Sequence, residues 1–389
     1  MTYELPLIWK DPAWPHLRFD MDRVTQALLV AKRMQGMVEG KWASISPRHR
    51  AILAASAWSD EAIATAAIEG ERYDRMSVES SVARRLGIDE GIGPHVPRDI
   101  EGLLDVMDDA LIRCAVPLTH ERLWSWQGAL FPESRSGLRK IEVGAYRSHP
   151  GPMQIVSGPV GREKVHYEAP PSSRVLLEME RFVKWFNGTP GKDPLVIAAI
   201  AHVWFESIHP FEDGNGRIGR TLIDLVLARE MGPSSRVIRM SKQLLKEREA
   251  YYEGLRESQV VDVTRWVEWF LDQVCACCRE ACQAIDVVLE TTRFWMEHQG
   301  ADLSTRQRKV MRLLLDAGPN GFEGGMSTRK YESIGATSRA TASRELQQLE
   351  ELGFLRRVGA GRSTRYHVAI DGWGPADDKS AKDPSDTAG

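Results

Sequence analysis

The sequence predicts a mainly α-helical protein, with a helical core, one small β-hairpin and a smaller C-terminal domain. Three observations support this prediction. Apolar residues recur at helical spacing through most of residues 21–298. Residues 137–168 lack that spacing and place short apolar runs between Gly and Pro, which favours a hairpin. Residues 301–370 contain twelve Lys or Arg against seven Asp or Glu, although the whole chain has a formal net charge of −3.

The order of the elements follows from the same patterns. The first 20 residues are rich in Pro and Trp and predict an extended arm. Helices are then expected at about 21–39, 47–68, 98–114, 119–130, 173–187, 194–207, 217–231, 241–257, 262–298, 304–316, 327–334 and 338–352. A Gly-containing β pattern follows at 353–368. The expected divisions are an arm with helices (1–110), a core (111–298), a second domain (299–370) and a disordered polar tail (371–389).

The composition narrows the class of protein and its compartment. A net charge of −3 gives no global reason to expect nucleic acid or a membrane as a partner. No stretch is apolar enough for a membrane span, and the first residues do not resemble a signal peptide. Five cysteines, an odd number, suit a reducing compartment, so a cytoplasmic location is expected. Cys275, Cys278 and Cys282 share a helical face, but without a His pattern they predict packing rather than a zinc site.

The most informative stretch runs from His209 to Arg220 and reads HPFEDGNGRIGR. It lies between two apolar helical patterns and therefore predicts a loop that opens into the N-terminus of the second helix. Gly214 and Gly216 allow positive φ and a close approach of the backbone to a ligand. Asn215 is expected to cap the following helix, whose free N–H groups suit an anion.

The side chains of this stretch fit a reaction on a nucleotide phosphate. Arg217 and Arg220 lie three residues apart on one helical face, where they can hold successive phosphates. Asp213 supplies a hard oxygen ligand for Mg²⁺, and His209 has the chemistry of a general base. Phe211 is expected to anchor the loop in the core. Each feature alone is usually structural, but their combination at this spacing indicates a site.

This stretch resembles the signature of the Fic family, His-Pro-Phe-x-(Asp/Glu)-Gly-Asn-Gly-Arg-x-x-Arg, and every specified position matches. The resemblance extends over about residues 50–275. It implies a helical core that transfers AMP from ATP to a hydroxyl side chain of a target protein. The related Doc toxins carry Lys in place of Gly216 and phosphorylate instead, so Gly216 favours AMP transfer.

The resemblance also implies a role for each matching residue. His209 would deprotonate the target hydroxyl, Asp213 would hold Mg²⁺, and Arg220 would hold the γ-phosphate. The remaining nucleotide-binding residues would be Phe211, Gly214, Asn215, Gly216 and Arg217, with Tyr251 and Tyr252 beside the adenine. A tyrosine pair is more often part of ordinary packing, so the adenine role depends on the resemblance. The implied cofactors are ATP and Mg²⁺.

A second motif precedes the core. The Ala-rich stretch that ends in Glu69 and Gly70 predicts a helix with a negative charge in its last turn, where the helix dipole disfavours it by about 0.3–1 kcal/mol. By itself this is most simply a tolerated surface glutamate. Thr65-x-x-x-Glu69-Gly70 resembles the Fic inhibitory motif, however, in which the glutamate pairs with the second motif arginine, here Arg220. The sequence therefore predicts an autoinhibited enzyme.

The predicted hairpin within 137–168 has a counterpart in the family. Fic proteins carry a hairpin flap over the active site that receives the target segment as an added strand. Ile155, Val156 and Ser157 are the flap candidates here. Without the resemblance, a surface hairpin with no role is the simpler interpretation.

The predicted second domain, with three helices followed by a two-stranded hairpin, resembles a winged helix-turn-helix. Arg339 and Arg344 lie near the start of its expected recognition helix, and Arg362 and Arg365 lie on the expected wing. DNA binding is one interpretation. Dimerisation or docking of a target protein through the same domain is equally consistent with the modest charge excess.

The leading functional hypothesis is an autoinhibited adenylyltransferase that modifies Ser, Thr or Tyr of a target protein, and self-modification is also consistent with the sequence. A second hypothesis is the reverse reaction, in which Glu69 and His209 position a water that removes AMP. A third is a DNA-binding regulator that senses a nucleotide. The sequence leaves open the target, a homodimer and the direction of the reaction, and it predicts no membrane partner.

Overall fold

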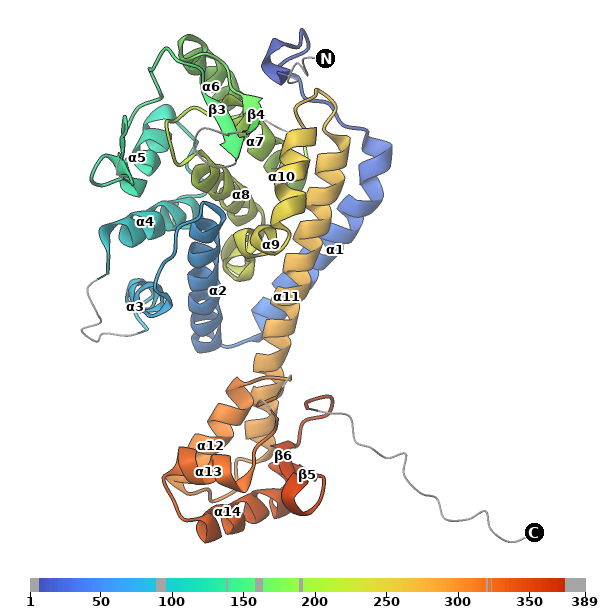
Figure 1. Cartoon of the computed structure of the whole chain (residues 1–389). Coiled ribbons are helices and arrows are strands. Elements are labelled where there is room, and N and C mark those ends of the chain that lie inside the picture. The colour runs from blue at the N-terminus through green and yellow to red at the C-terminus, as the bar shows by residue number, and fades with distance from the viewer. Residues whose placement is uncertain are drawn as a thin grey trace. The chain divides into compact units, whose positions relative to one another are not determined.

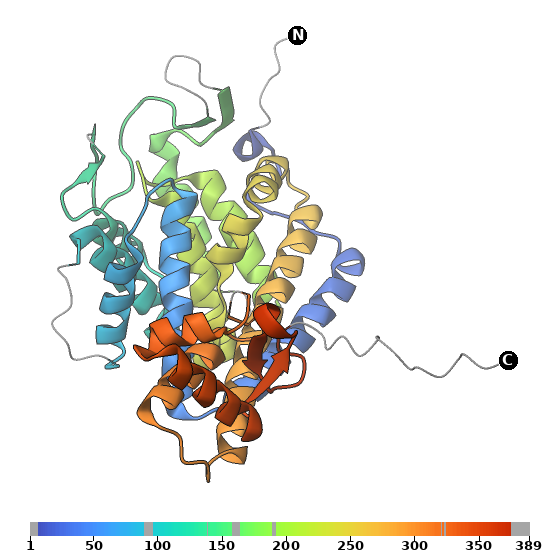
Figure 2. The ribbon, with the colours of Figure 1, turned by 60° about the horizontal axis from the view of Figure 1, so that its bottom comes forward.

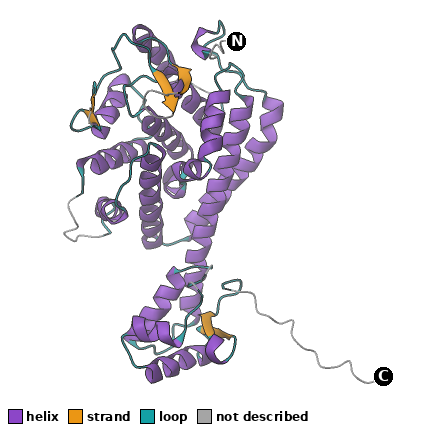
Figure 3. Cartoon of the chain, viewed as in Figure 1, coloured by secondary structure: helices purple, strands orange, loops and turns teal. Residues whose placement is uncertain are grey.

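The computed structural model describes residues 7–88, 96–137, 139–157, 164–188, 192–319, 321–322 and 324–374. The chain divides into two compact units, Met1–Gln283 and Ala284–Gly389. Helices predominate in both units, and the strands of the described residues form three two-stranded antiparallel hairpins (Figure 3). The predicted mainly α-helical fold is confirmed. None of the helices described is both long and apolar enough to cross a membrane.

The first unit contains most of the helices (Figure 1). After a short 3₁₀ turn, η1 (Ile8–Lys10), they are α1 (Met21–Ser44), α2 (Pro47–Ile68), α3 (Arg75–Arg85), α4 (Arg98–Ile112), α5 (His120–Leu130), α6 (Ser172–Asn187), α7 (Pro194–Ile208), α8 (Asn215–Met231), α9 (Met240–Lys246), α10 (Arg248–Glu257) and α11 (Thr264–Glu297). A 3₁₀ segment, η2 (Gly232–Val237), follows α8. The division between the two units falls within α11.

The core of the first unit is built around α7 and α8. Helix α7 is apolar on almost every face, and a helix of this kind is stable only when other elements surround it. It packs against α8, which also contacts α2, α4 and α5. Two views agree that α2 lies beside α8 (Figures 1 and 2). The loop that joins α7 to α8 is therefore held between buried helices, next to the end of α2.

Helix α2 has clear signals at both ends. The Ser46 side chain accepts a hydrogen bond from the His49 backbone N–H, and Pro47 occupies the first helical position. Gly70 follows the last turn with a φ of +85°. Its N–H donates to Ala67 O, and the Glu71 N–H donates to Ala66 O, which is the Schellman arrangement. The backbone direction of residues 69–71 is therefore fixed by a defined turn.

The structure of this unit differs from the predicted elements in three places. Helix α3 was not expected, because among its eleven residues only Val78, Ser81 and Val82 are buried and the apolar spacing is weak. The segment expected as one helix at 241–257 is two helices, broken at Glu247, whose φ of −101° and ψ of 32° leave the helical region. Finally, residues 135–168 contain two hairpins rather than one.

The first of these hairpins pairs β1 (Arg135–Ser136) with β2 (Arg139–Lys140). The second pairs β3 (Gln154–Ser157) with β4 (Lys164–Glu168), so that Ile155 lies opposite Tyr167. The N-terminal arm contacts this hairpin, because the Trp9 indole N–H donates to Glu168 O at 2.8 Å. The side chains of Val156 and Ser157 lie outside the described part of the structure.

The second unit contains α12 (Thr305–Asp316), α13 (Thr328–Gly335), α14 (Arg339–Glu351), β5 (Leu355–Val358) and β6 (Arg365–Val368), with a short 3₁₀ turn, η3 (Gly361–Ser363), between the strands. Its own core includes the buried side chains of Val310, Tyr331, Leu346, Phe354 and Tyr366. The order of three helices and a hairpin agrees with the expected elements. Residues 375–389, where a disordered tail was expected, lie outside the described residues.

Candidate active site

The loop between α7 and α8 has two residues in the left-handed region. His209 follows the last turn of α7 with a φ of +49°, and Gly214 precedes α8 with a φ of +88°. A non-glycine residue rarely adopts this conformation, so the surrounding structure must hold it in place. The positive φ expected of Gly214 is therefore confirmed, whereas Gly216 lies in the first turn of α8 without a positive φ.

Arg147 is the residue that holds the loop at His209. Its side chain donates to His209 O at 2.8 Å, to Ile208 O at 3.3 Å and to Pro170 O at 2.5 Å. Its backbone N–H donates to Pro210 O. Arg147 is only 4% exposed, and burial lowers its pKa to about 10, so it remains charged at neutral pH. A buried cation at the C-terminus of α7 also suits the helix dipole.

Asn215 closes the loop from the other side. Its side-chain amide accepts from Phe211 N and donates to Phe211 O, both at 2.9 Å. The expected capping role is wrong, because Gly214 occupies the N-cap and Asn215 is already helical. Phe211 is fully buried and packs against Tyr146, as expected of a loop anchor. Both side chains thus fix the loop.

The imidazole of His209 lies beside a buried carboxylate. Its Nδ1 is 3.6 Å from Glu206 Oε2, one helical turn earlier in α7. Although burial alone would raise the pKa of Glu206, the neighbouring His209, His202 and Arg220 hold that pKa below its ordinary value. Glu206 is therefore ionised and faces Nδ1, which leaves Nε2 of His209 available for a proton from a substrate. The sequence motifs did not single out Glu206, although its position three residues before His209 was a signal.

Each carboxylate oxygen of Asp213 accepts a hydrogen bond. Oδ1 accepts from Gly214 N at 2.6 Å, and Oδ2 accepts from the Ser136 hydroxyl on β1. No group of three or more His, Cys, Asp or Glu that could bind a metal occurs among the residues described. A single oriented carboxylate nevertheless suits Mg²⁺, which usually binds through one or two carboxylates together with substrate phosphates.

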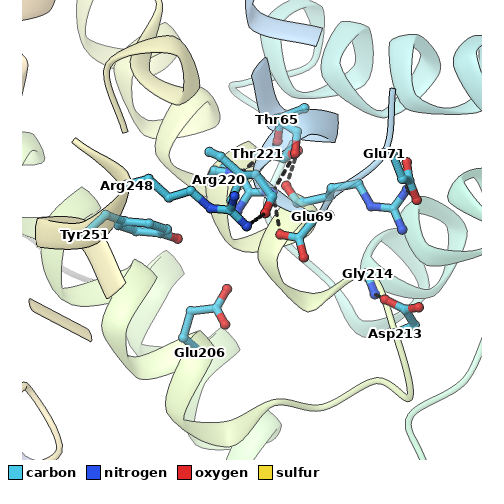
Figure 4. Close-up of polar contacts among 12 residues, drawn as sticks. Thr65, Glu69, Glu71, Glu206, Asp213, Gly214, Arg220, Thr221, Arg248 and Tyr251 are labelled. Carbon is cyan, nitrogen blue, oxygen red and sulfur yellow. Dashed lines mark hydrogen bonds and ion pairs between the residues drawn. The ribbon is translucent and has the colours of Figure 1, made fainter. Parts of the chain in front are cut away.

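Arg220 is bound by the end of α2 (Figure 4). Its Nη2 lies 2.8 Å from Glu69 Oε1 and 3.1 Å from Thr65 O, and its Nε donates to the Thr65 hydroxyl at 2.8 Å. The Arg220 side chain is 3% exposed. Burial alone would lower its pKa, but the Glu69 carboxylate raises the pKa above its ordinary value. The three residues that the inhibitory motif and the Fic motif singled out are thus brought together.

A second carboxylate contacts the other motif arginine. Glu71 Oε1 lies 3.0 Å from Arg217 Nη1, and the Tyr73 hydroxyl donates to Glu71 Oε2 at 3.0 Å. Burial raises the pKa of Tyr73, and Glu71 raises it further, so the phenol remains a donor. The Arg217 guanidinium lies over the ring of Phe131, 4.8 Å from its centroid. The motifs gave no signal for Glu71, because the inhibitory pattern ends at Gly70.

Gly216 allows two side chains to approach the backbone of α8 closely. A Cβ at this position would lie 2.2 Å from Glu69 Oε1 and 3.0 Å from Arg220 Nη1. The Glu69 carboxylate therefore rests directly on the first turn of α8. This is the place where a helix N-terminus binds an anion, with free N–H groups and the positive end of the dipole. A carboxylate of this chain thus lies where a phosphate was expected.

The two tyrosines expected beside the adenine differ in burial. Tyr251 is 1% exposed, and its hydroxyl is 2.8 Å from His202 Nε2. Tyr252 is 44% exposed, and its hydroxyl donates to Ile68 O, the last carbonyl of α2, at 3.2 Å. Arg248 donates to the same carbonyl and lies over the Tyr252 ring. Only Tyr252 therefore offers a ring to a ligand in this arrangement.

The remaining candidates belong to other elements than the motif loop. Ile155 is half-buried on β3, at the hairpin expected to be the flap. In the second unit, Arg339 and Arg344 are exposed on the first turns of α14. Arg365 is half-buried and donates to Thr364 O, and the side chain of Arg362 lies outside the described part of the structure.

Two families match separate parts of the sequence. The Fic/DOC family matches residues 117–227, which include the motif loop. A domain of unknown function, DUF4172, matches residues 7–88, which include α2 and both glutamates of its terminal turn.

Related proteins match shorter stretches. The protein adenylyltransferase Fic of Drosophila melanogaster is 29% identical over 170 residues, which cover 43% of this chain and 32% of that protein. Protein adenylyltransferase fic-1 of Caenorhabditis briggsae is 35% identical over 97 residues, 24% of this chain and 18% of that protein. The chain thus spans about a third or less of these relatives. A solved structure of a Fic family protein from Desulfovibrio desulfuricans G20 shares the fold, with a TM-score of 0.51 and 23% identity over 88% of this chain and 95% of its own.

Proposed function

Since residues 117–227 of this chain form a Fic/DOC family domain, we propose that the protein transfers AMP from ATP to a hydroxyl side chain of a target protein. The observation that carries the proposal is the motif loop, in which one imidazole, one oriented carboxylate and two arginines surround the N-terminus of α8. The similarity to protein adenylyltransferases supports it.

In the proposed reaction, the oxygen of the target hydroxyl attacks the α-phosphorus of ATP. A new oxygen–phosphorus bond forms, the bond to the bridging oxygen breaks, and pyrophosphate leaves. His209 accepts the hydroxyl proton at Nε2, while Glu206 stabilises the resulting imidazolium from the Nδ1 side. Arg217, Arg220 and the N–H groups of the first turn of α8 bind the phosphates.

Asp213 is the residue that would hold Mg²⁺ in this site, because its carboxylate is oriented by Ser136 and by the backbone of Gly214. When bound, the ion would neutralise charge on the phosphates. Tyr252 would cover one face of the adenine.

We further propose that Glu69 inhibits the enzyme. It pairs with Arg220 and rests against Gly216, so it competes with a phosphate for the same donors. The guanidinium of Arg220 is almost fully buried, so water screens its attraction to Glu69 very little. Glu69 is therefore a strong competitor of the phosphate. The target segment would add to the edge of the β3–β4 hairpin near Ile155.

Replacement of Glu69 tests both parts of this proposal. In the Glu69→Gly variant, Arg220 becomes available to the γ-phosphate, and we expect transfer of α-³²P label from ATP to protein to rise at least tenfold over the parent. The Glu69→Gly/His209→Ala variant should lose this label, because the base is gone. The assay contains Mg²⁺ and a cell lysate as the source of targets.

The absence of label in all three proteins would contradict AMP transfer. The same proteins would then be tested for release of AMP from a modified target, since Glu69 and His209 could instead position a water. Release by the parent and not by Glu69→Gly would establish the reverse reaction.

A second candidate function is DNA binding by the second unit. Helix α14 begins after the Ser338 cap and exposes Arg339 and Arg344 in its first turns, the part of a recognition helix that contacts bases and phosphates. Such binding would accompany the enzymatic activity rather than replace it. The local excess of basic residues agrees with a nucleic acid partner.

Fluorescence anisotropy with labelled duplex DNA tests this function. We expect binding by the whole chain that weakens at least tenfold between 50 and 200 mM salt, as phosphate contacts require. Arg339→Ala/Arg344→Ala should lose it, while Arg312→Ala, a change at an exposed residue of α12, should retain it. Equal loss in both variants would point to non-specific charge, and no binding at 50 mM salt would exclude this function.

A further inference from the structure

The turn that ends α2 carries two carboxylates, and each contacts a different arginine of the motif. Glu69 pairs with Arg220, and Glu71 pairs with Arg217. We propose that Glu71 is a second, separately releasable lock, which withholds Arg217 from the nucleotide. This inference rests on the proposed function, since it concerns the regulation of the same site.

The geometry of the turn accounts for the double contact. In the Schellman arrangement around Gly70, Glu69 immediately precedes the left-handed residue and Glu71 follows it. The two arginines lie three residues apart on α8, which places them on one face, one turn from each other. Glu71 pairs with Arg217 and Glu69 pairs with Arg220. The order of the glutamates along the turn is therefore opposite to the order of the arginines along α8.

Neighbouring residues hold both partners of the contact at Arg217 in place. The Arg217 side chain is 3% exposed, so its charge is largely removed from water. Tyr73 donates to Glu71 and fixes the carboxylate, while Phe131 covers one face of the guanidinium. An exposed ion pair would contribute little, but here one partner is buried and both are held by neighbours.

Arg217 also retains a donor that Glu71 does not use. Both oxygens of Glu71 contact the same nitrogen, Nη1, at 3.0 and 3.1 Å. The Nε of Arg217 is buried and has no hydrogen-bond partner among the described residues. A buried unpaired donor is unfavourable, and a phosphate with three oxygens could satisfy both nitrogens. Arg217 therefore has the features of an anion subsite that Glu71 occupies incompletely.

The lock at Arg217 differs from the lock at Arg220 in what stays bound to the arginine after release. Arg220 donates to Glu69 and, through two further bonds, to Thr65, which would remain after the loss of Glu69. Arg217 has Glu71 as its carboxylate partner, and Glu71 is 37% exposed. Because each glutamate contacts a different arginine, Glu71 and Glu69 can be released separately.

A set of four proteins tests the second lock: the parent, Glu71→Gln, Glu69→Gly and Glu69→Gly/Glu71→Gln. Binding of a fluorescent ATP analogue is measured with Mg²⁺, and label transfer is measured separately. Gln keeps the size and the acceptor of the side chain but removes its charge. We expect little transfer from Glu71→Gln alone, because Glu69 still holds Arg220. In the double variant we expect analogue binding to tighten about fivefold or more relative to Glu69→Gly.

Two controls separate the contact from general charge. Glu79→Gln removes a half-exposed carboxylate of α3 that pairs with Arg75, and it should leave analogue binding unchanged. In an Arg217→Gln background, Glu71→Gln should have no further effect. Equal or weaker binding in the double variant than in Glu69→Gly would overturn the second lock, whatever the transfer assay gives. Tighter binding without transfer in any protein would support the lock and refute AMP transfer.

Discussion

At the scale of single residues, Arg147 holds the backbone around the proposed base. The acceptors that the structure describes for its side chain are three main-chain carbonyls, including those of Ile208 and His209. A guanidinium with rigid, divergent donors can hold several carbonyls of one loop at fixed angles. These bonds help His209 to keep its left-handed backbone, a conformation that is uncommon for residues other than glycine.

Arg147→Met should damage both stability and activity. Buried carbonyls would lose their donors at about 1–3 kcal/mol each, and partial relaxation should leave a net loss of about 2–3 kcal/mol in the free energy of unfolding. In a Glu69→Gly background, label transfer should fall at least tenfold, because the imidazole would be displaced. Denaturant titration and the label assay measure the two effects.

The exposed Arg113, paired with Asp109 on α4, provides the comparison. Arg113→Met should change the free energy of unfolding by less than about 0.5 kcal/mol and leave transfer intact. If Arg147→Met lost stability and kept full transfer, Arg147 would support the fold without positioning His209.

Residue identity predicted some roles better than others. The motif pointed directly to the proposed chemistry of His209, Asp213 and Arg220, because few other functions need these residues at this spacing. The division between Tyr251 and Tyr252 was not evident, since adjacent helical residues point about 100° apart and only the packing decides which one is buried. Glu71 was also hidden, because its partner lies 146 residues away.

At the scale of elements, a single turn at the end of α2 positions both of the proposed locks. Gly70 has a φ of +85°, and a Cβ added to it would meet no atom within 4 Å, so its constraint is conformational and not steric. An alanine there would cost about 1 kcal/mol in the left-handed region. The turn would then shift, and the two carboxylates it directs would shift with it.

Gly70→Ala should therefore raise transfer by the otherwise unchanged chain while it lowers the free energy of unfolding by about 1 kcal/mol. Gly87→Ala is a matched control, because Gly87 ends α3 with a φ of +64° in open space. It should lose similar stability without a gain in transfer. Gly70→Asn should keep the inhibition, since Asn tolerates the left-handed region. A rise in transfer with Gly87→Ala would indicate general loosening instead of a directed turn.

The elements themselves were predicted where apolar spacing was strong. Helix α7 is buried along nearly its whole length, and its pattern was clear. Helix α3 was missed because it presents mostly polar residues, and its contact with α2 is what stabilises it. The break at Glu247 was also missed, because backbone dihedrals at a junction leave little trace in the spacing of apolar residues.

At the scale of the whole molecule, the chain joins two units with separate cores. The first contains every residue of the proposed reaction, and the second contains the helix that exposes Arg339 and Arg344. The shift in charge near residue 300 predicted this division, because a change in composition often accompanies a change of domain. The observed division lies some residues earlier, within α11, where the helical pattern runs on without a break.

The terminal turn of α2 determines how the proposed inhibition would depend on protein concentration. Glu69 and Glu71 belong to the same chain as the arginines they occupy, so they act as tethered ligands. Their effective concentration is set by the turn and does not change when the protein is diluted. In the proposed mechanism, ATP would therefore compete against a constant local concentration of carboxylate. The nucleotide concentration needed to displace the carboxylates would then be set by this turn of the backbone and would not depend on the amount of protein in the cell.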